Sequence, residues 1–92
     1  MAPTPTKIFT ISGIVQGVGY RYFASAAAGR HKIMGFARNL PDGRVEVLAE
    51  GEPEAMLAFR QDLERGPVVA RVDKVIESDP GVAETFTAFS IL

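Results

Sequence analysis

The sequence predicts an α+β domain in which one antiparallel sheet carries two helices on a single face. Two observations favour this class. Strand-like and helix-like segments follow each other in the order β-α-β-β-α-β, with one further strand at the end, and only two segments favour helix. Two helices cannot cover both faces of such a sheet, so both should pack on one side. This order is the ferredoxin-like split βαβ arrangement, and it respects the right-handed crossover rule.

The first half of the chain predicts a strand, a helix and a hairpin. Residues 7–12 are β-branched and aromatic, which favours a strand that ends at Gly13. Residues 20–32 are rich in alanine, which favours a helix able to approach a sheet closely. Pro41-Asp42-Gly43 has typical turn chemistry, since proline sets φ and glycine accepts a positive φ. This turn joins two strands expected at residues 34–40 and 45–50.

The second half predicts a helix and two more strands. Pro53 suits the first helical position, and Met56, Phe59 and Leu63 form one apolar stripe at helical spacing. Gly66-Pro67 ends this helix, because glycine accepts a left-handed cap and proline cannot continue the helix. The two strands are expected at residues 71–78 and 86–91.

Length and composition indicate one domain over residues 7–92, preceded by a flexible, proline-containing tail at 1–6. The absence of cysteine excludes disulfides, and a single histidine without a carboxylate cluster argues against a structural metal. No signal peptide or membrane span is visible, so we expect a cytoplasmic protein, and the length fits a monomer. The net charge is −1, with the excess of cations in the first half.

The most informative local feature is GIVQGVGYR at residues 13–21, a strand end, a glycine turn and a helix start. Amide groups at a helix N-terminus form an anion site. A cation there is disfavoured by about 0.3–1 kcal/mol, so Arg21 would be relieved by a bound anion. The stretch lacks the Lys-Ser/Thr of a Walker loop and the third glycine of a dinucleotide loop. On spacing alone, a purely steric turn remains equally open.

The wider pattern resembles the acylphosphatase family. The resemblance rests on GxVQGVGYR from Gly13, on GFARNxxDGxVEV from Gly35, and on four later positions, and it extends from about Ile8 to Ile91. The combination of the two motifs is far more specific than either alone. The later positions are Gly51, Phe59, Leu63 and the Gly66-Pro67 pair.

This resemblance implies hydrolysis of a small acyl phosphate to a carboxylate and inorganic phosphate, without metal, cofactor or covalent intermediate. Arg21 matches the phosphate-binding arginine, and Asn39 matches the asparagine that positions the attacking water. The backbone amides of the loop match the phosphate cradle; besides Arg21 they belong to Gln16, Gly17, Val18, Gly19 and Tyr20. One alternative is a non-catalytic phosphate- or carbamoyl-phosphate-binding module. A single-stranded RNA binder on the same fold is disfavoured, because the predicted strands carry few aromatic residues and the chain has no net basic charge. We therefore expect no nucleic-acid partner.

Several other residues invite a functional interpretation that the sequence does not favour. His31 is expected to face solvent near the end of the first helix. Arg38 should point to the sheet face opposite Asn39 and act as a surface charge. At least one of Tyr20 and Tyr22 should be in the core. Lys32 stands where the family often has glycine, which leaves the exit geometry of the first helix open.

Overall fold

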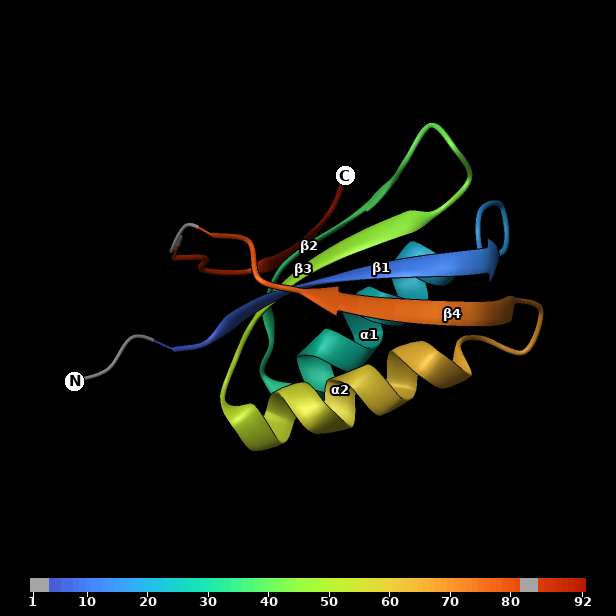
Figure 1. The fold of residues 1–92 in the computed structure, drawn as a ribbon. Helices are drawn as coiled ribbons and strands as arrows, with labels where there is room; N and C mark the ends of the chain where they lie inside the picture. The colour runs from blue at the N-terminus through green and yellow to red at the C-terminus, as the bar shows by residue number, and fades with distance from the viewer. Residues whose placement is uncertain (1–3, 82–84) are drawn as a thin grey trace.

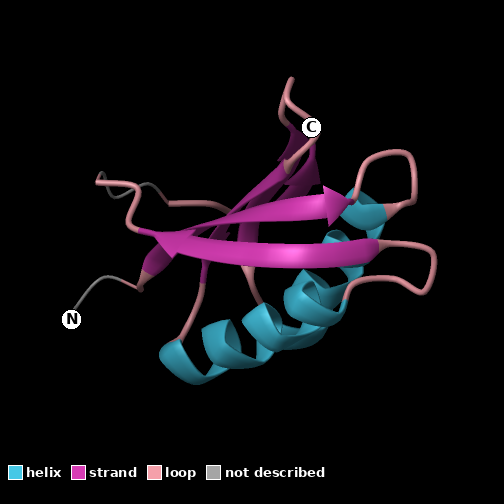
Figure 2. Ribbon diagram, turned by 45° about the vertical axis from the view of Figure 1, so that its right-hand side comes forward, coloured by secondary structure: helices cyan, strands magenta, loops and turns pink. Residues whose placement is uncertain are grey.

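The computed structural model describes residues 4–81 and 85–92, and this part of the chain has the expected architecture. One five-stranded sheet carries two helices on the same face (Figures 1 and 2). The elements are β1 (Thr6–Ile14), α1 (Tyr20–His31), β2 (Met34–Asn39), β3 (Val45–Glu50), α2 (Pro53–Arg65), β4 (Arg71–Ser78) and β5 (Phe89–Ile91). The predicted ferredoxin-like α+β fold is confirmed.

The strand order is β4-β1-β3-β2-β5, so β3 lies between β1 and β2. The pairs β1–β3, β2–β3 and β1–β4 are antiparallel, whereas β2–β5 is parallel. Since β1 and β2 both run antiparallel to β3, their carboxyl ends lie at the same end of the sheet. Val45 shows this directly, because it pairs with Ile11 on one side and with Asn39 on the other. The β1–α1 loop and the β2–β3 turn therefore lie at the same end (Figure 1).

The ends of the outer segments differ from the sequence expectation. The first strand runs on to Ile14 through an irregularity between Ser12 and Gly13. The last strand occupies only residues 89–91 rather than 86–91, because Phe86 makes other contacts. Its amide donates to Glu50 Oε2 at 3.0 Å, and its ring packs edge-on against Phe36 at 6.2 Å.

The amino-terminal end of the ladder begins inside the segment expected to be a tail. Thr6 already pairs with Glu50, and the carbonyl of Pro5 accepts a hydrogen bond from Gly51 at 3.1 Å. The remainder of the expected tail, residues 1–3, lies outside the described residues.

The core lies between the sheet and the helices. The predicted stripe of α2 is confirmed, since Met56, Phe59 and Leu63 are all buried. Phe59 packs edge-on against Phe9 of β1 and Phe89 of β5, with ring centroids 6.1 and 6.2 Å apart. On α1 the buried face consists mainly of alanine, which lets this helix approach the sheet closely. The described chain contains no helix that is long and apolar enough to span a bilayer.

Lys32 forms the carboxyl-terminal cap of α1. It adopts the left-handed conformation that glycine normally supplies, with φ 55° and ψ 44°, and its amide donates to the carbonyl of Ala28. Ile33 donates to the same carbonyl at 2.8 Å. The chain thus keeps the tight helix exit in spite of the Cβ atom at this position, and the strain stays in the folded state.

We expect Lys32→Gly to raise the free energy of unfolding by about 0.5–1 kcal/mol, because glycine removes the left-handed strain and loses part of the gain to unfolded-state entropy. Urea denaturation measures this difference. The matched control is Lys32→Ala, which removes the ammonium group but keeps the Cβ atom, and which should not stabilise the protein. Equal stabilisation by both variants would show that charge rather than backbone strain is responsible.

Candidate functional site

The loop between β1 and α1 is anchored at one end and shaped by glycine. Val15 is buried, and Val18 packs against the core. Gly17 and Gly19 have φ values of 75° and 78°. A Cβ atom at either position would meet nothing within 4 Å, so glycine serves backbone conformation here rather than space. The turn therefore leads the chain from the end of the sheet straight into the first turn of α1.

The first turn of α1 has no side-chain cap for its amide groups within the described residues. Gly19 occupies the N-cap and has no side chain to bond the first amides, and the first turn contains no acidic residue. Arg21 lies within this turn. Free amides, the positive end of the helix dipole and a guanidinium group all favour an anion at this point.

The two tyrosines beside Arg21 have different environments. Tyr20 is buried, and its hydroxyl donates to the carbonyl of Leu63 at 2.7 Å. Burial raises the pKa of Tyr20 well above its usual value, so the phenol stays neutral. Tyr22 is 72% exposed. The prediction that at least one of the two is in the core is confirmed, and Tyr20 leaves only its backbone to face the loop.

Gln16 joins the loop to the β2–β3 hairpin. Its Nε2 donates to the carbonyl of Leu40 at 2.8 Å and to the carbonyl of Arg44 at 2.9 Å. These two residues flank the hairpin turn, and Leu40 directly follows Asn39. The glycine loop and the end of β2 are therefore side by side and hydrogen-bonded.

Arg21 is tied to the opposite side of β2 through the last strand. Its Nη1 donates to the main-chain oxygen of Leu92, and the amide of Leu92 donates to the carbonyl of Ala37 at 2.9 Å. The guanidinium group is thus held close to β2, and this bond uses one of its five N–H donors.

Asn39 ends β2 on the helix side of the sheet. Ala37, two residues earlier, is buried under the helices, and strand alternation gives Asn39 the same face. Its side chain is exposed and makes no hydrogen bond within residues 4–81 and 85–92. The neighbouring Arg38 has the opposite orientation, as expected: it pairs with Glu46 at 2.8 Å and lies 6.0 Å from the ring centroid of Phe36.

The expectation that His31 faces solvent is wrong. Its side chain is only 26% exposed, and Nε2 lies 2.7 Å from Asp62 Oδ2 of α2. Arg30 and Arg65 also contact Asp62, at 3.2 and 2.9 Å. Burial raises the pKa of Asp62, but the hydrogen bonds from His31, Arg30 and Arg65 outweigh this effect and hold the pKa below its usual value. His31 therefore links the two helices.

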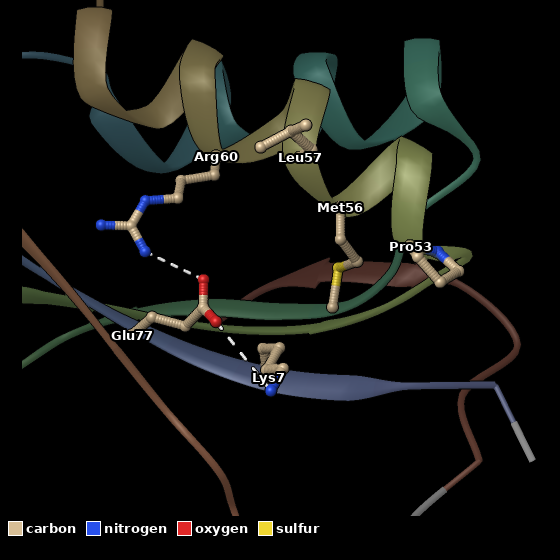
Figure 3. Close-up of a pocket in the computed structure, with 6 residues that line it drawn as sticks. All are labelled: Lys7, Pro53, Met56, Leu57, Arg60 and Glu77. Carbon is tan, nitrogen blue, oxygen red and sulfur yellow. Dashed lines mark hydrogen bonds and ion pairs between the residues drawn. The ribbon is translucent and has the colours of Figure 1, made fainter.

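Two cavities of the described chain lie away from the loop and Asn39. Figure 3 shows one of about 240 Å³ between α2, β1 and β4, where Glu77 accepts from Arg60 at 2.9 Å and lies 3.9 Å from Lys7. Another, of about 360 Å³, lies beside the end of α1 and the segment that leads into β5. Neither includes a predicted site residue. Within the described residues no three metal-ligating side chains gather.

Comparison with known proteins identifies the family. Residues 7–91 match the family described as Acylphosphatase. The chain belongs to the acylphosphatase family. It is 51% identical over 71 residues to a protein of Thermus thermophilus named Acylphosphatase, covering 77% of this chain and 81% of that one. A Mannheimia succiniciproducens protein of the same name is 44% identical over 85 residues, covering 92% and 94%.

A solved structure supports the same conclusion. The crystal structure of the acylphosphatase from Bacillus subtilis matches with a TM-score of 0.90 at 34% identity, covering 95% of this chain and 97% of that one. The expected family, fold and acylphosphatase-type hydrolase are confirmed. A non-catalytic phosphate- or carbamoyl-phosphate-binding module is not favoured, because the acylphosphatases matched are close to this chain in length.

Two contacts at the candidate site were not anticipated from the sequence. The Gln16 side chain bonds two carbonyls that are 24 and 28 residues away, and Arg21 bonds a main-chain oxygen 71 residues away. Carbonyl acceptors carry no sequence signature, since every residue has one. The arrangement of the strands is needed to find them.

We expect Tyr20→Phe to lower the free energy of unfolding by about 1–2 kcal/mol, because it leaves the buried carbonyl of Leu63 without its donor. Urea denaturation measures the loss. The control is Tyr22→Phe, whose hydroxyl is on an exposed ring, and which should change stability by less than about 0.5 kcal/mol. Equal effects from the two variants would contradict a structural role specific to Tyr20.

We expect Asp62→Asn to destabilise the protein at pH 7 by about 1–2 kcal/mol, because three charge-assisted contacts are weakened. A folded-state pKa below the usual value means that the wild-type carboxylate stabilises the fold above about pH 3.9 and loses this effect as the pH falls further. The difference in the free energy of unfolding between wild type and variant should therefore be present at pH 7 and nearly vanish at pH 2.5. A gap that does not change with pH would contradict the assignment, and Glu64→Gln, in an exposed pair, serves as the control.

Proposed function

We propose that this chain hydrolyses the carboxyl–phosphate bond of small acyl phosphates, with phosphate bound by the loop of residues 16–21 and water positioned by Asn39. One observation carries the proposal: hydrogen bonds from Gln16 join the loop that leads into the uncapped first turn of α1 to the hairpin that carries Asn39. An anion cradle and a free carboxamide are thereby combined at one end of the sheet. Either feature alone would support binding but not hydrolysis.

Phosphate binding falls to the loop amides and to Arg21. The amides of residues 16–21 approach the amino-terminal end of α1, where the helix dipole favours negative charge. The planar fork of Arg21 matches two oxygens of a phosphoryl group. The phosphate would also remove the unfavourable interaction between the Arg21 cation and the start of its own helix.

Asn39 positions the attacking water. Its carboxamide has an acceptor and two donors, so it can orient a water molecule that is also bonded to the phosphoryl group. The group comes from the same sheet face as α1 and has no partner within the described residues. A carboxamide is a weak base, so its part is orientation rather than proton removal.

The reaction needs little beyond positioning and charge stabilisation. The water oxygen forms a bond to phosphorus while the bond from phosphorus to the acyl oxygen breaks, and the electron pair leaves with the carboxylate. A phosphate oxygen takes the proton of the attacking water, which gives a carboxylate and dihydrogen phosphate. The carboxylate is a good leaving group, so neither a strong general acid nor a metal is required.

We extend this proposal to a metal-independent, monomeric enzyme of the cytoplasm without a nucleic-acid partner. The absence of cysteine suits a reducing compartment, and the cradle already supplies the positive charge that the phosphoryl group needs. Turnover that persists in chelator, and a sedimentation mass of one chain, test the first two points.

Arg21→Ala and Asn39→Ala should each lower kcat/KM for a simple acyl phosphate by a factor of about 10²–10³ or more, as for loss of one transition-state donor. Arg21→Ala should cost more, because charge-assisted bidentate contacts are the strong ones. Phosphate release in chelator-containing buffer measures the rates. Far-ultraviolet circular dichroism confirms that the variants are folded.

Arg38→Ala is the matched control. It removes a cation directly beside Asn39, but one that faces the other side of the sheet and pairs with Glu46. Its activity should stay within a few-fold of wild type. No phosphate release by folded wild-type protein would overturn the proposed function, and full activity of Arg21→Ala or Asn39→Ala would overturn that residue's role.

A further inference from the structure

We propose that the Gln16 side chain is a positioning residue, which sets the distance between the phosphate cradle and the water held by Asn39. The inference rests on the proposed function and assigns Gln16 a task distinct from phosphate binding. Its Nε2 donates to Leu40 at 2.8 Å and to Arg44 at 2.9 Å. Both acceptors belong to the hairpin that carries Asn39.

The two carbonyls are the hydrogen-bonded ends of the hairpin turn. The oxygen of Leu40 also accepts from the amide of Gly43 at 3.2 Å, and the oxygen of Arg44 accepts from the amide of Leu40 at 2.8 Å. Gln16 therefore attaches to the turn where its own backbone bonds already close it. The amide of Leu40 is bonded in the same cluster, and Asn39 is the residue before it.

This use of the amide group leaves the Gln16 side chain without a donor for the phosphate. A glutamine amide has two N–H donors, and here one is directed to each carbonyl. No donor remains on Nε2 for a phosphate oxygen. The backbone amide of Gln16 stays available to bind phosphate. The main chain of this residue would therefore bind the substrate, while its side chain positions the loop.

The surrounding backbone explains why such a restraint matters. Gly17, directly after Gln16, has a positive φ and open space around it, and glycine can leave this conformation at little cost. On the other side, residues 41–44 are exposed. The loop after β1 and the β2–β3 turn lie at the same end of the sheet but follow different strands. Among the described residues, the Gln16 side chain bonds the loop to the turn. An in-line attack requires reacting atoms about 3–3.5 Å apart, so a small relative shift is costly.

Gln16→Met tests the inference, since methionine has similar length and no donor. We expect kcat for an acyl phosphate to fall by a factor of about 10–100, in line with a misplacement of about 1 Å. The inhibition constant of inorganic phosphate should change less than about threefold, because Arg21 and the loop amides are untouched. Gln16→Asn, which keeps the amide but is one methylene too short to reach both carbonyls, should behave in the same way.

A double-mutant cycle separates positioning from general damage. If Gln16 acts through Asn39, Gln16→Met should have little further effect on kcat in an Asn39→Ala background. A full and additive loss in that background would overturn the inference. So would wild-type kcat in folded Gln16→Met, or a loss of phosphate affinity equal to the loss of kcat.

Ile33→Val is the control for stability. It removes one methyl group from a buried side chain just after the carboxyl end of α1. This change should lower the free energy of unfolding by about 0.5–1.5 kcal/mol without changing kcat. A matching fall of kcat in Ile33→Val would show that lowered stability alone explains the Gln16 variants. The proposed function has its own test, because it fails if wild type shows no turnover. The Gln16 inference fails when wild type is active and Gln16→Met either keeps the wild-type kcat, loses phosphate affinity as much as kcat, or lowers kcat fully in the Asn39→Ala background.

Discussion

The central position of β3 is the constraint on which the rest of the molecule depends. Because β3 runs against both of its neighbours, β1 and β2 must run in the same direction, and α1 must cross from one to the other. Val45 pairs with Ile11 of β1 and with Asn39 of β2, so these two residues lie level with each other across β3. The loop that follows β1 and the turn that follows β2 therefore lie at the same end of the sheet.

The site uses this shared end with very few side chains. The glycine loop adds amides and a helix start, Arg21 adds charge, and Asn39 adds a carboxamide from the neighbouring strand. Long-range hydrogen bonds from Gln16 and Arg21 then join these parts to β2 and to the residue that follows β5. The chemistry proposed for the site depends on geometry rather than on an acidic or basic group with a strongly shifted pKa. Stable pairing at the ends of the strands therefore matters for this chemistry.

Much of this arrangement could be predicted from the sequence. The hairpin, the stripe of α2 and the glycine turn each have local signals, and together they predict the topology that brings Asn39 to the loop. The orientation of His31 could not be predicted in the same way. On α1 the buried face is mostly alanine, so no strong apolar stripe indicates which side of the helix is covered. The final strand is shorter than its pattern suggests because Phe86 packs on Phe36 and bonds Glu50, and such a tertiary contact leaves no trace in local periodicity.

The hydrogen bond from Arg21 to Leu92 has a consequence for the order in which the molecule acquires its parts. It spans 71 positions, so it belongs to the most non-local contacts of the chain. Contacts of this kind form late in folding, because the loop they close carries the largest entropic cost. A chain made from its amino terminus has the glycine loop, α1 and the hairpin long before Leu92 exists. The arginine accordingly reaches this orientation only when Leu92 is in place beside β2, so the ladders of β1 to β4 can form while this part of the candidate site is still incomplete.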